Sequence, residues 1–303
     1  MSFFNAAPRR RPHAALATAL CLAALAAAMP AQAQSVLDKI KSSGQINVGY
    51  RSDAAPFSYL DDRKQPMGYS IDICGAVVEQ IKQQLGLSEL RVKMTPIAVD
   101  RVMRFVKDGV VDILCSSTSD TPERREEVSF SKPIYIDGVA VMVRKKDGIS
   151  SIDDFKGKAV VVIKTTTAAE AVEAYQKKHA TGVLVESALN ADAALSQLQL
   201  GWVQGYARDR VLLAMQLASL KDGDQYAILP GELSKEAVAI AFRKGDAGME
   251  AVVNKAIAAS VSSGKANAWY DKWFVMPIPL YSNKKALGIP MSSELKASFE
   301  STR

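Results

Sequence analysis

The stretch CSSTSDTPERREEVSF, from Cys115 to Phe130, marks an abrupt change from apolar to polar sequence. It follows the apolar run VVDILC and opens with small hydroxyl-bearing residues. Thr121 is a favourable N-cap, and Pro122 suits the first position of a helix, where a missing N–H does no harm. We therefore predict a buried strand that ends near Cys115 and a helix that begins at Pro122.

Apolar runs and helix-period segments alternate on both sides of this stretch. Upstream, we expect strands at 45–50, 90–97 and 110–115 and helices at 70–86 and 100–109. A further strand is expected at 138–148, and the pattern then begins afresh. Downstream, we expect strands at 159–163, 182–187, 202–207 and 236–246 and helices at 168–178, 192–201, 208–219 and 248–264.

This alternation predicts an α/β fold with mostly parallel sheets covered by helices. Two such units joined by two extended crossings, near Val141–Arg144 and Ala239–Arg243, predict two lobes with a cleft between them. The expected division is 34–142 for the first part of lobe 1, 143–239 for lobe 2 and 240–303 for the return to lobe 1.

Residues 1–33 have the layout of a cleaved secretory signal. Arg9, Arg10 and Arg11 form a positive head, an apolar alanine-rich run follows, and small residues end at Ala33. The apolar run is too short and too weakly hydrophobic for a stable membrane span. We therefore expect a soluble, periplasmic mature protein.

The composition of the mature chain excludes several function classes. Without the three arginines, 35 basic side chains face 32 acidic ones, so the net charge of +6 falls to about +3. This balance is not a nucleic-acid footprint. His179 is the only histidine left, too few for a histidine-rich zinc site or a Ser-His-Asp triad. We expect no cofactor, no metal and a monomer.

The mature chain has two cysteines, Cys74 and Cys115. Whether they form a disulfide or stay free thiols is open.

The opening stretch lies where ligands bind in open α/β sheets, outside a strand end and against a helix start. Ser117 and Ser119 could offer hydroxyl groups, and Arg124 a two-pronged guanidinium suited to a carboxylate. By itself, the stretch also fits an ordinary capped helix with a solvated arginine.

The second unit repeats this arrangement, because the strand AVVVI runs into Lys164 and three threonines that include Thr166 and Thr167. Threonines before a helix are most often caps. Asp209, at another expected strand end, could pair with an ammonium group or cap the next helix. Arg51 follows the first strand, and two arginines at neighbouring strand ends suggest a ligand with two carboxylates.

The chain resembles the periplasmic solute-binding proteins of polar amino acid ABC transporters (family 3), and within them the glutamate/aspartate-binding branch. The similar segments cover nearly the whole mature chain in the family's order. They are LDKIKSSGQINVGYR (37–51), PFSYLDD (56–62), MGYSIDIC (67–74), STSDTPERREEVSFSKPIY (117–135), DDFKGKAVVVIKTTT (153–167) and WYDKWFVMPIPL (269–280).

The resemblance implies a type II periplasmic binding protein fold and a role for each candidate residue. Ser117, Ser119 and Arg124 would hold the α-carboxylate of the ligand. Thr166 or Thr167 would close over it from the other lobe. Asp209 would bind the ammonium group, and Arg51 would receive a side-chain carboxylate.

Some positions depart from the pattern of the branch. The run SSTSD brings an extra negative charge at Asp120, and Lys164 stands where a small residue is common. Ala191 stands in place of a histidine, and an arginine comes one position early, at Arg101. These departures leave amino acid binding intact and weaken the choice of glutamate over another polar amino acid.

The predicted function is that of a ligand-capturing clamp, with a free amino acid and a membrane permease as its partners. One alternative is an exported enzyme on the same fold, such as a cyclohexadienyl dehydratase. Another is a binding protein for glutamine or a further polar amino acid. A sensor domain is a third, but the membrane segment and signalling module that would accompany it are missing from the sequence.

Overall fold

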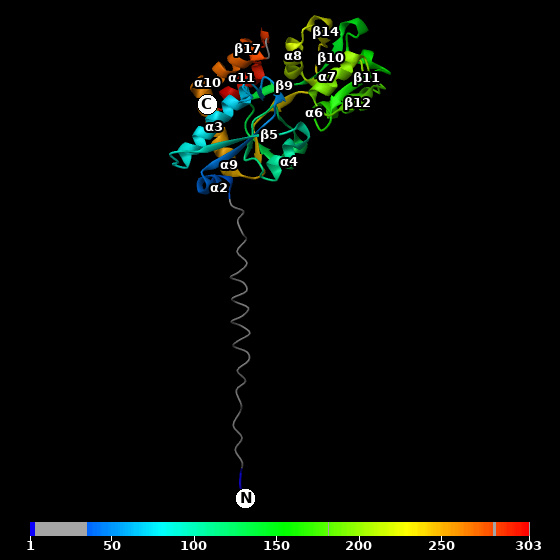
Figure 1. The fold of residues 1–303 in the computed structure, drawn as a ribbon. Helices are drawn as coiled ribbons and strands as arrows, with labels where there is room; N and C mark the ends of the chain where they lie inside the picture. Colours follow the sequence, from blue (N-terminus) through cyan, green and yellow to red (C-terminus); the bar gives the residue numbers. More distant parts are fainter. Residues whose placement is uncertain (4–34, 181, 281–282, 303) are drawn as a thin grey trace. The chain divides into compact units, whose positions relative to one another are not determined.

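The computed structural model describes residues 1–3, 35–180, 182–280 and 283–302, so the predicted signal segment lies largely outside the described residues. Two α/β lobes make up the body from Ser35 onward (Figure 1). Within the described ranges, we find no helix with the length and apolar character needed to cross a membrane.

The sheet of the first lobe runs in the order β5-β1-β6-β16-β8. Strand β1 is parallel to β5 and β6, whereas β16 is antiparallel to β6 and β8. The bounds are β5 Arg91–Pro96, β1 Gln45–Tyr50, β6 Ile113–Leu114, β16 Ala241–Arg243 and β8 Val128–Phe130.

The sheet of the second lobe runs in the order β12-β11-β13-β10-β14. Strand β11 is parallel to β12 and β13, whereas β10 is antiparallel to β13 and β14. The bounds are β12 Leu184–Ala188, β11 Ala159–Ile163, β13 Gly205–Asp209, β10 Val139–Arg144 and β14 Tyr226–Ile228. Four of the five strands in each sheet therefore run in the same direction, as the sequence predicts. The antiparallel strand, β16 in the first sheet and β10 in the second, directly follows a crossing.

The two crossings pair with each other in a small sheet of order β7-β15-β9. Its strands are β7 Ser119–Asp120, β15 Glu236–Val238 and β9 Tyr135–Asp137. Because β10 lies in the second sheet from Val139 onward, the first crossing comes earlier than expected. The segment expected as one strand at 236–246 divides into β15 and β16, which belong to different sheets.

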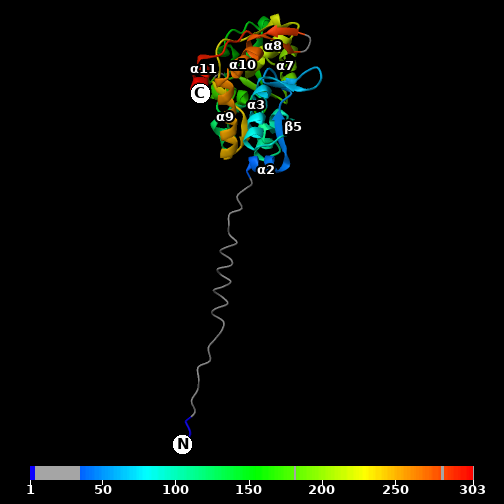
Figure 2. The same ribbon diagram turned by 90° about the vertical axis from the view of Figure 1, so that its left-hand side faces the viewer.

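Helices cover both sheets, and their apolar spacing explains how they pack. On α3, Ile73, Val77 and Ile81 recur every four residues and are buried. Helices α3 and α9 lie side by side in both views (Figures 1 and 2). The helices are α2 Val36–Ser43, α3 Tyr69–Gln84, α4 Val102–Lys107, α5 Pro122–Arg125, α6 Thr167–His179, α7 Ala191–Leu200, α8 Arg210–Ser219, α9 Ala247–Ser262, α10 Lys265–Tyr270 and α11 Ser293–Glu300.

Helices near the carboxyl end share a hydrophobic core with the first lobe. Buried residues of α9, α10 and α11, among them Val253, Tyr270 and Phe299, pack with Ile46 of β1 and Val77 of α3. The second sheet has a separate apolar cluster on each of its faces. Short hairpins complete the described fold: β2 Asp53–Ala54 with β3 Ser58–Leu60 and β4 Pro66–Met67, and β17 Pro277–Leu280 with β18 Asn283–Ala286.

Candidate functional site

The helix expected after the opening stretch is present as α5. Thr121 is its N-cap and accepts a hydrogen bond from the backbone N–H of Arg124 at 3.3 Å, and Pro122 is its first residue. A disulfide joins Cys74 of α3 to Cys115, just before the run of serines. The bond ties the start of this loop to the buried face of α3.

Serines of this loop are buried. Ser117 is 8% exposed, and its hydroxyl has no hydrogen-bond partner among the described residues. Buried polar atoms in folded proteins are nearly always hydrogen-bonded. The hydroxyl of Ser117 is therefore available to hydrogen-bond a polar ligand. Ser119 is also buried, and its backbone carbonyl accepts a hydrogen bond from Nη1 of Arg124 at 2.9 Å.

Arg124 lies in an acidic environment that spans both lobes. Burial lowers the pKa of its guanidinium, while the carboxylates of Glu170, Asp209 and Glu236 act in the opposite direction. Arg51 adds a like charge. Arg124 of the first lobe thus interacts electrostatically with Glu170 and Asp209 of the second lobe. Such an interaction is expected of a residue at a site between the lobes.

The threonine turn of the second lobe precedes α6, as the sequence predicts. Thr166 is the N-cap residue, but its hydroxyl donates to the carbonyl of Ile163 at 2.8 Å and does not cap the helix. Thr167 is the first helical residue and is 6% exposed. Thr165 has a φ of +63°, a left-handed conformation that is uncommon for a β-branched residue. Glu170, one turn later on α6, acts on Arg124, which places the start of α6 near the first lobe's arginine.

Asp209 ends β13 and precedes α8, and its side chain makes no cap hydrogen bond. Burial and the nearby Glu236 raise the pKa of Asp209 to about 6, against the attraction of Arg208, Arg51 and Arg124. This carboxyl group would gain from a cationic partner. The expected helix at 208–219 begins only at Arg210, because β10 pairs with Arg208 and Asp209 in the sheet.

Arg51 is 6% exposed at the end of β1. Its Nε and Nη2 donate to the two carboxylate oxygens of Asp53 at 2.9 and 3.0 Å. Arg208 of the second lobe donates from Nη2 to the backbone carbonyl of Asp53 at 2.9 Å. Asp53 therefore contacts an arginine from each lobe.

Sequence reasoning missed Asp53, Arg208 and Glu236. The helix predicted at 208–219 includes Arg208, whereas the structure places Arg208 on β13, next to Asp209. Glu236 is on a crossing, and one of its carboxylate oxygens accepts from Ser234 at 2.6 Å while the other is buried without a partner among the described residues. A signal was present for Asp53, since an acidic residue two positions after Arg51 lies on the same side of an extended chain.

The residues that depart from the branch's pattern now have positions. Asp120 pairs with Nε and Nη2 of Arg125, each at 2.5 Å, so its charge is neutralised outside the candidate site. Lys164 and Arg101 line a cavity of about 810 Å³ that reaches both lobes.

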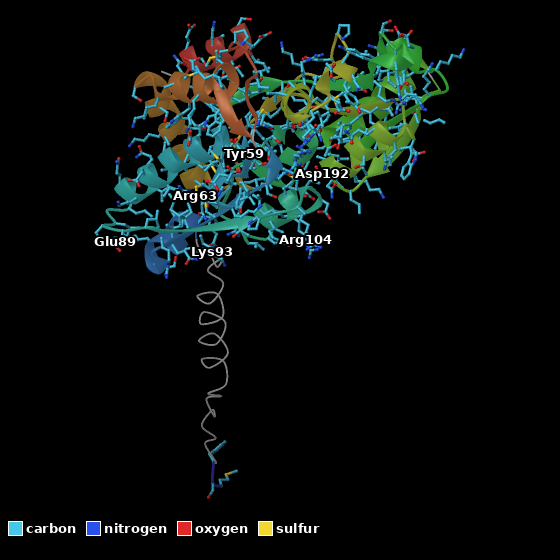
Figure 3. The ribbon with its side chains drawn as sticks, turned by 45° about the horizontal axis from the view of Figure 1, so that its top comes forward. Tyr59, Arg63, Glu89, Lys93, Arg104 and Asp192 are labelled. Carbon is cyan, nitrogen blue, oxygen red and sulfur yellow. A yellow bond between two sulfur atoms is a disulfide. The ribbon has the colours of Figure 1, made fainter. Side chains whose placement is uncertain are left out.

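A second cavity of about 400 Å³ lies beside the inter-lobe contact and is lined by Asp53 and Arg208. Tyr59 and Asp192, labelled in Figure 3, also line it, from the first and second lobe respectively. Asp53 and Asp192 line both cavities and so stand between them. Among the described residues, no cluster of histidine, cysteine and acidic side chains is arranged to hold a metal ion.

Arg51, Arg124 and Asp209 thus interact electrostatically, and the two hydroxyl-rich turns follow the carboxyl ends of β6 and β11. Arginines that can bind carboxylates and an aspartate that can bind an amine interact where the lobes meet. This set of charges is complementary to an amino acid zwitterion.

Comparisons with known proteins identify the family of the chain. Residues 46–276 match the family described as bacterial extracellular solute-binding proteins, family 3. The chain is 36% identical over 283 residues to an L-glutamate/L-aspartate-binding protein of Pseudomonas aeruginosa, with 93% of each chain covered. It is 34% identical over 268 residues to a glutamate/aspartate import solute-binding protein of Salmonella typhimurium, with 88% of each covered. These curated relatives are named as binding proteins and not as enzymes.

A solved structure has the same fold. It is an ancestral amino acid-binding protein described as a precursor of cyclohexadienyl dehydratase, 25% identical, with a TM-score of 0.68. The alignment covers 79% of this chain and 99% of that one. The fold is therefore the two-lobed α/β fold of type II periplasmic binding proteins, and the chain belongs to the bacterial extracellular solute-binding proteins, family 3.

Proposed function

We propose that this protein is the extracytoplasmic binding component of an amino acid ABC transporter, with L-glutamate or L-aspartate as its ligand. The relatives named for these two amino acids support the ligand class, and the charges of the site support it independently. The observation that carries the proposal is the set formed by Arg124, Asp209 and the orphan hydroxyl of Ser117.

Each part of the ligand has a partner in this proposal. Arg124, Ser117 and Ser119 hold the α-carboxylate, and Asp209 binds the ammonium group. Thr166 or Thr167 covers the ligand from the second lobe. Arg51 binds the side-chain carboxylate of the ligand. A guanidinium has five N–H groups, and the pairing with Asp53 uses only two of them.

We propose that the lobes open and close about the paired strands β9 and β15, where the chain passes between the two sheets. In this proposal the second lobe begins near Val139, where β10 enters the second sheet, and ends near residue 239. Ligand contacts from both lobes favour the closed form, because a ligand shifts an equilibrium only by binding one state better. The closed form docks on the membrane permease as a monomer, in the periplasm, after removal of residues 1–33.

The enzyme alternative is not favoured. A dehydratase would need a general acid or base that is free of ligand-binding duty. Asp209 has the pKa for such a role, but it is the carboxylate that the ammonium group of an amino acid requires.

Thermal unfolding of the mature protein with each standard amino acid tests the proposal. A ligand at about one hundred times its Kd adds roughly 2.7 kcal/mol to the free energy of unfolding. Glutamate and aspartate should give the largest shifts, and non-amino-acid anions such as acetate should give none. An absence of any shift across the set would refute the proposal.

A further inference from the structure

Arg51, Asp53 and Arg208 form a three-residue charge set across the two lobes. The carboxylate of Asp53 accepts two hydrogen bonds from Arg51, and its backbone carbonyl accepts one from Arg208. The two contacts differ in their electrostatic effect, since a carboxylate neutralises a guanidinium and a carbonyl does not.

The charge of Arg51 is therefore largely cancelled by its own neighbour. Both oxygens of Asp53 lie within 3.0 Å of the Nε–Nη2 edge of Arg51, a side-on bidentate pair. The pairing leaves Nη1 and one N–H of Nη2 for other acceptors. Arg51 can still donate hydrogen bonds to a ligand, but together with Asp53 it contributes no net charge.

Arg208 supplies the positive charge that this pair lacks. It is 6% exposed, and the hydrogen bond to the carbonyl of Asp53 fixes its guanidinium against the first lobe. Asp53, Asp209 and Tyr206 support its charge against the cost of burial. Asp209 is reserved for the ammonium group in the proposed function, so the set of Arg51, Asp53 and Arg208 carries a net charge of +1 at the side-chain end of the site.

We propose that Arg208 and Asp53 determine the specificity of the site: Arg208 provides the net positive charge that selects an acidic side chain, and Asp53 reduces that selection. This inference rests on the proposed function and names which residues set the ligand class. Because Arg208 belongs to the second lobe, the positive charge is complete only when the lobes meet.

Charge arithmetic gives an ordered series of variants. Arg208→Gln lowers the net charge of the set to 0, Asp53→Asn raises it to +2, and the double variant returns it to +1. Arg208→Lys keeps the charge with a different geometry. Arg104, which is labelled in Figure 3 and whose side chain is 80% exposed, offers a matched control as Arg104→Gln.

The test is calorimetric titration of wild type and these variants with L-glutamate and with L-glutamine, which differ by one charge and little in shape. The measured quantity is the ratio of the Kd for glutamine to the Kd for glutamate. We expect R208Q to lower the ratio about tenfold and D53N to raise it about tenfold. The double variant and R208K should stay within about threefold of wild type, and R104Q should not change the ratio.

Each outcome bears on the inference. An R208Q protein that keeps the wild-type ratio, or a double variant that stays as unselective as R208Q, overturns it. If R208Q does not fold, D53N decides, because a ratio that fails to rise contradicts the charge account. Wild type that binds amino acids without preferring the acidic one also overturns it, whereas wild type that binds no amino acid refutes the proposed function instead.

Discussion

Cys74, in the middle of helix α3, is bonded to Cys115, the residue that directly precedes the serine run of the candidate site. The bond spans 41 positions of sequence and joins two buried residues. It therefore connects the core of the first lobe to the loop that carries Ser117 and Ser119.

We predict that Cys74→Ser/Cys115→Ser lowers the free energy of unfolding by about 2–4 kcal/mol, mainly because the unfolded chain loses a constraint. Urea denaturation of oxidised wild type and of the double variant measures this difference. Reduced wild type is the matched control and should resemble the variant. Equal stability of the oxidised and reduced proteins would contradict the prediction.

Arg124→Ala should weaken binding of every amino acid by about a hundredfold or more, because all of them share the α-carboxylate and a buried charge would lose its partner. Calorimetry with glutamate, aspartate and glutamine checks this. The exposed Arg104→Ala serves as control. Retention of tight binding by the Arg124 variant would show that the carboxylate is held elsewhere.

Arg51→Met should weaken the binding of glutamate more than that of glutamine, because only glutamate carries the side-chain charge. The ratio of the Kd for glutamine to the Kd for glutamate should fall about tenfold. The same titrations measure this. Equal losses for the two ligands would mean that Arg51 supports the site without touching the side chain.

Binding should depend on pH through Asp209. Because its pKa in the folded protein is raised to about 6, the group is largely ionised at pH 7 and protonated at pH 5. An ammonium ligand needs the ionised form, so binding well below pH 6 requires release of a proton and weakens by about tenfold per pH unit.

Without ligand, a rise in pH has the opposite effect on Asp209, because ionisation of this group lowers the free energy of unfolding. A carboxyl group whose folded pKa lies above its unfolded value holds a proton more tightly in the folded state. Its contribution to the free energy of unfolding therefore decreases as pH rises from about 4 to about 6. Unfolding measured across this range, compared with Asp209→Asn, gives the contribution of Asp209 together with its effect on Asp137, whose pKa is raised by burial and by Asp209. A pH profile that is the same in both proteins would contradict the raised pKa.

Local sequence signals were sufficient where one segment determines its own conformation. Thr121 and Pro122 predicted the start of α5 because capping depends on neighbouring residues alone. The four-residue spacing of Ile73, Val77 and Ile81 likewise predicted α3. The candidate site followed from the rule that ligands bind beyond strand ends in α/β sheets.

Pairings between distant segments could not be predicted in this way. The contact between Arg208 and Asp53 joins positions that are 155 residues apart, and it depends on how the lobes meet. Asp120, in contrast, has a partner only five residues away in Arg125, but its sequence did not reveal whether it faces the ligand or this neighbour. The sequence did not predict that β10 and β16 run antiparallel to their neighbours, because a pattern of apolar residues does not indicate the direction of a strand in its sheet.

The central claim is that the charges where the lobes meet bind an acidic amino acid. Calorimetric titration of residues 34–303 with L-glutamate near pH 7.5 tests it most directly. We predict saturable binding of one glutamate per chain with a Kd of about 1 μM or below, equivalent to roughly 8 kcal/mol or more. No heat of binding with glutamate or aspartate at millimolar concentration would contradict the claim.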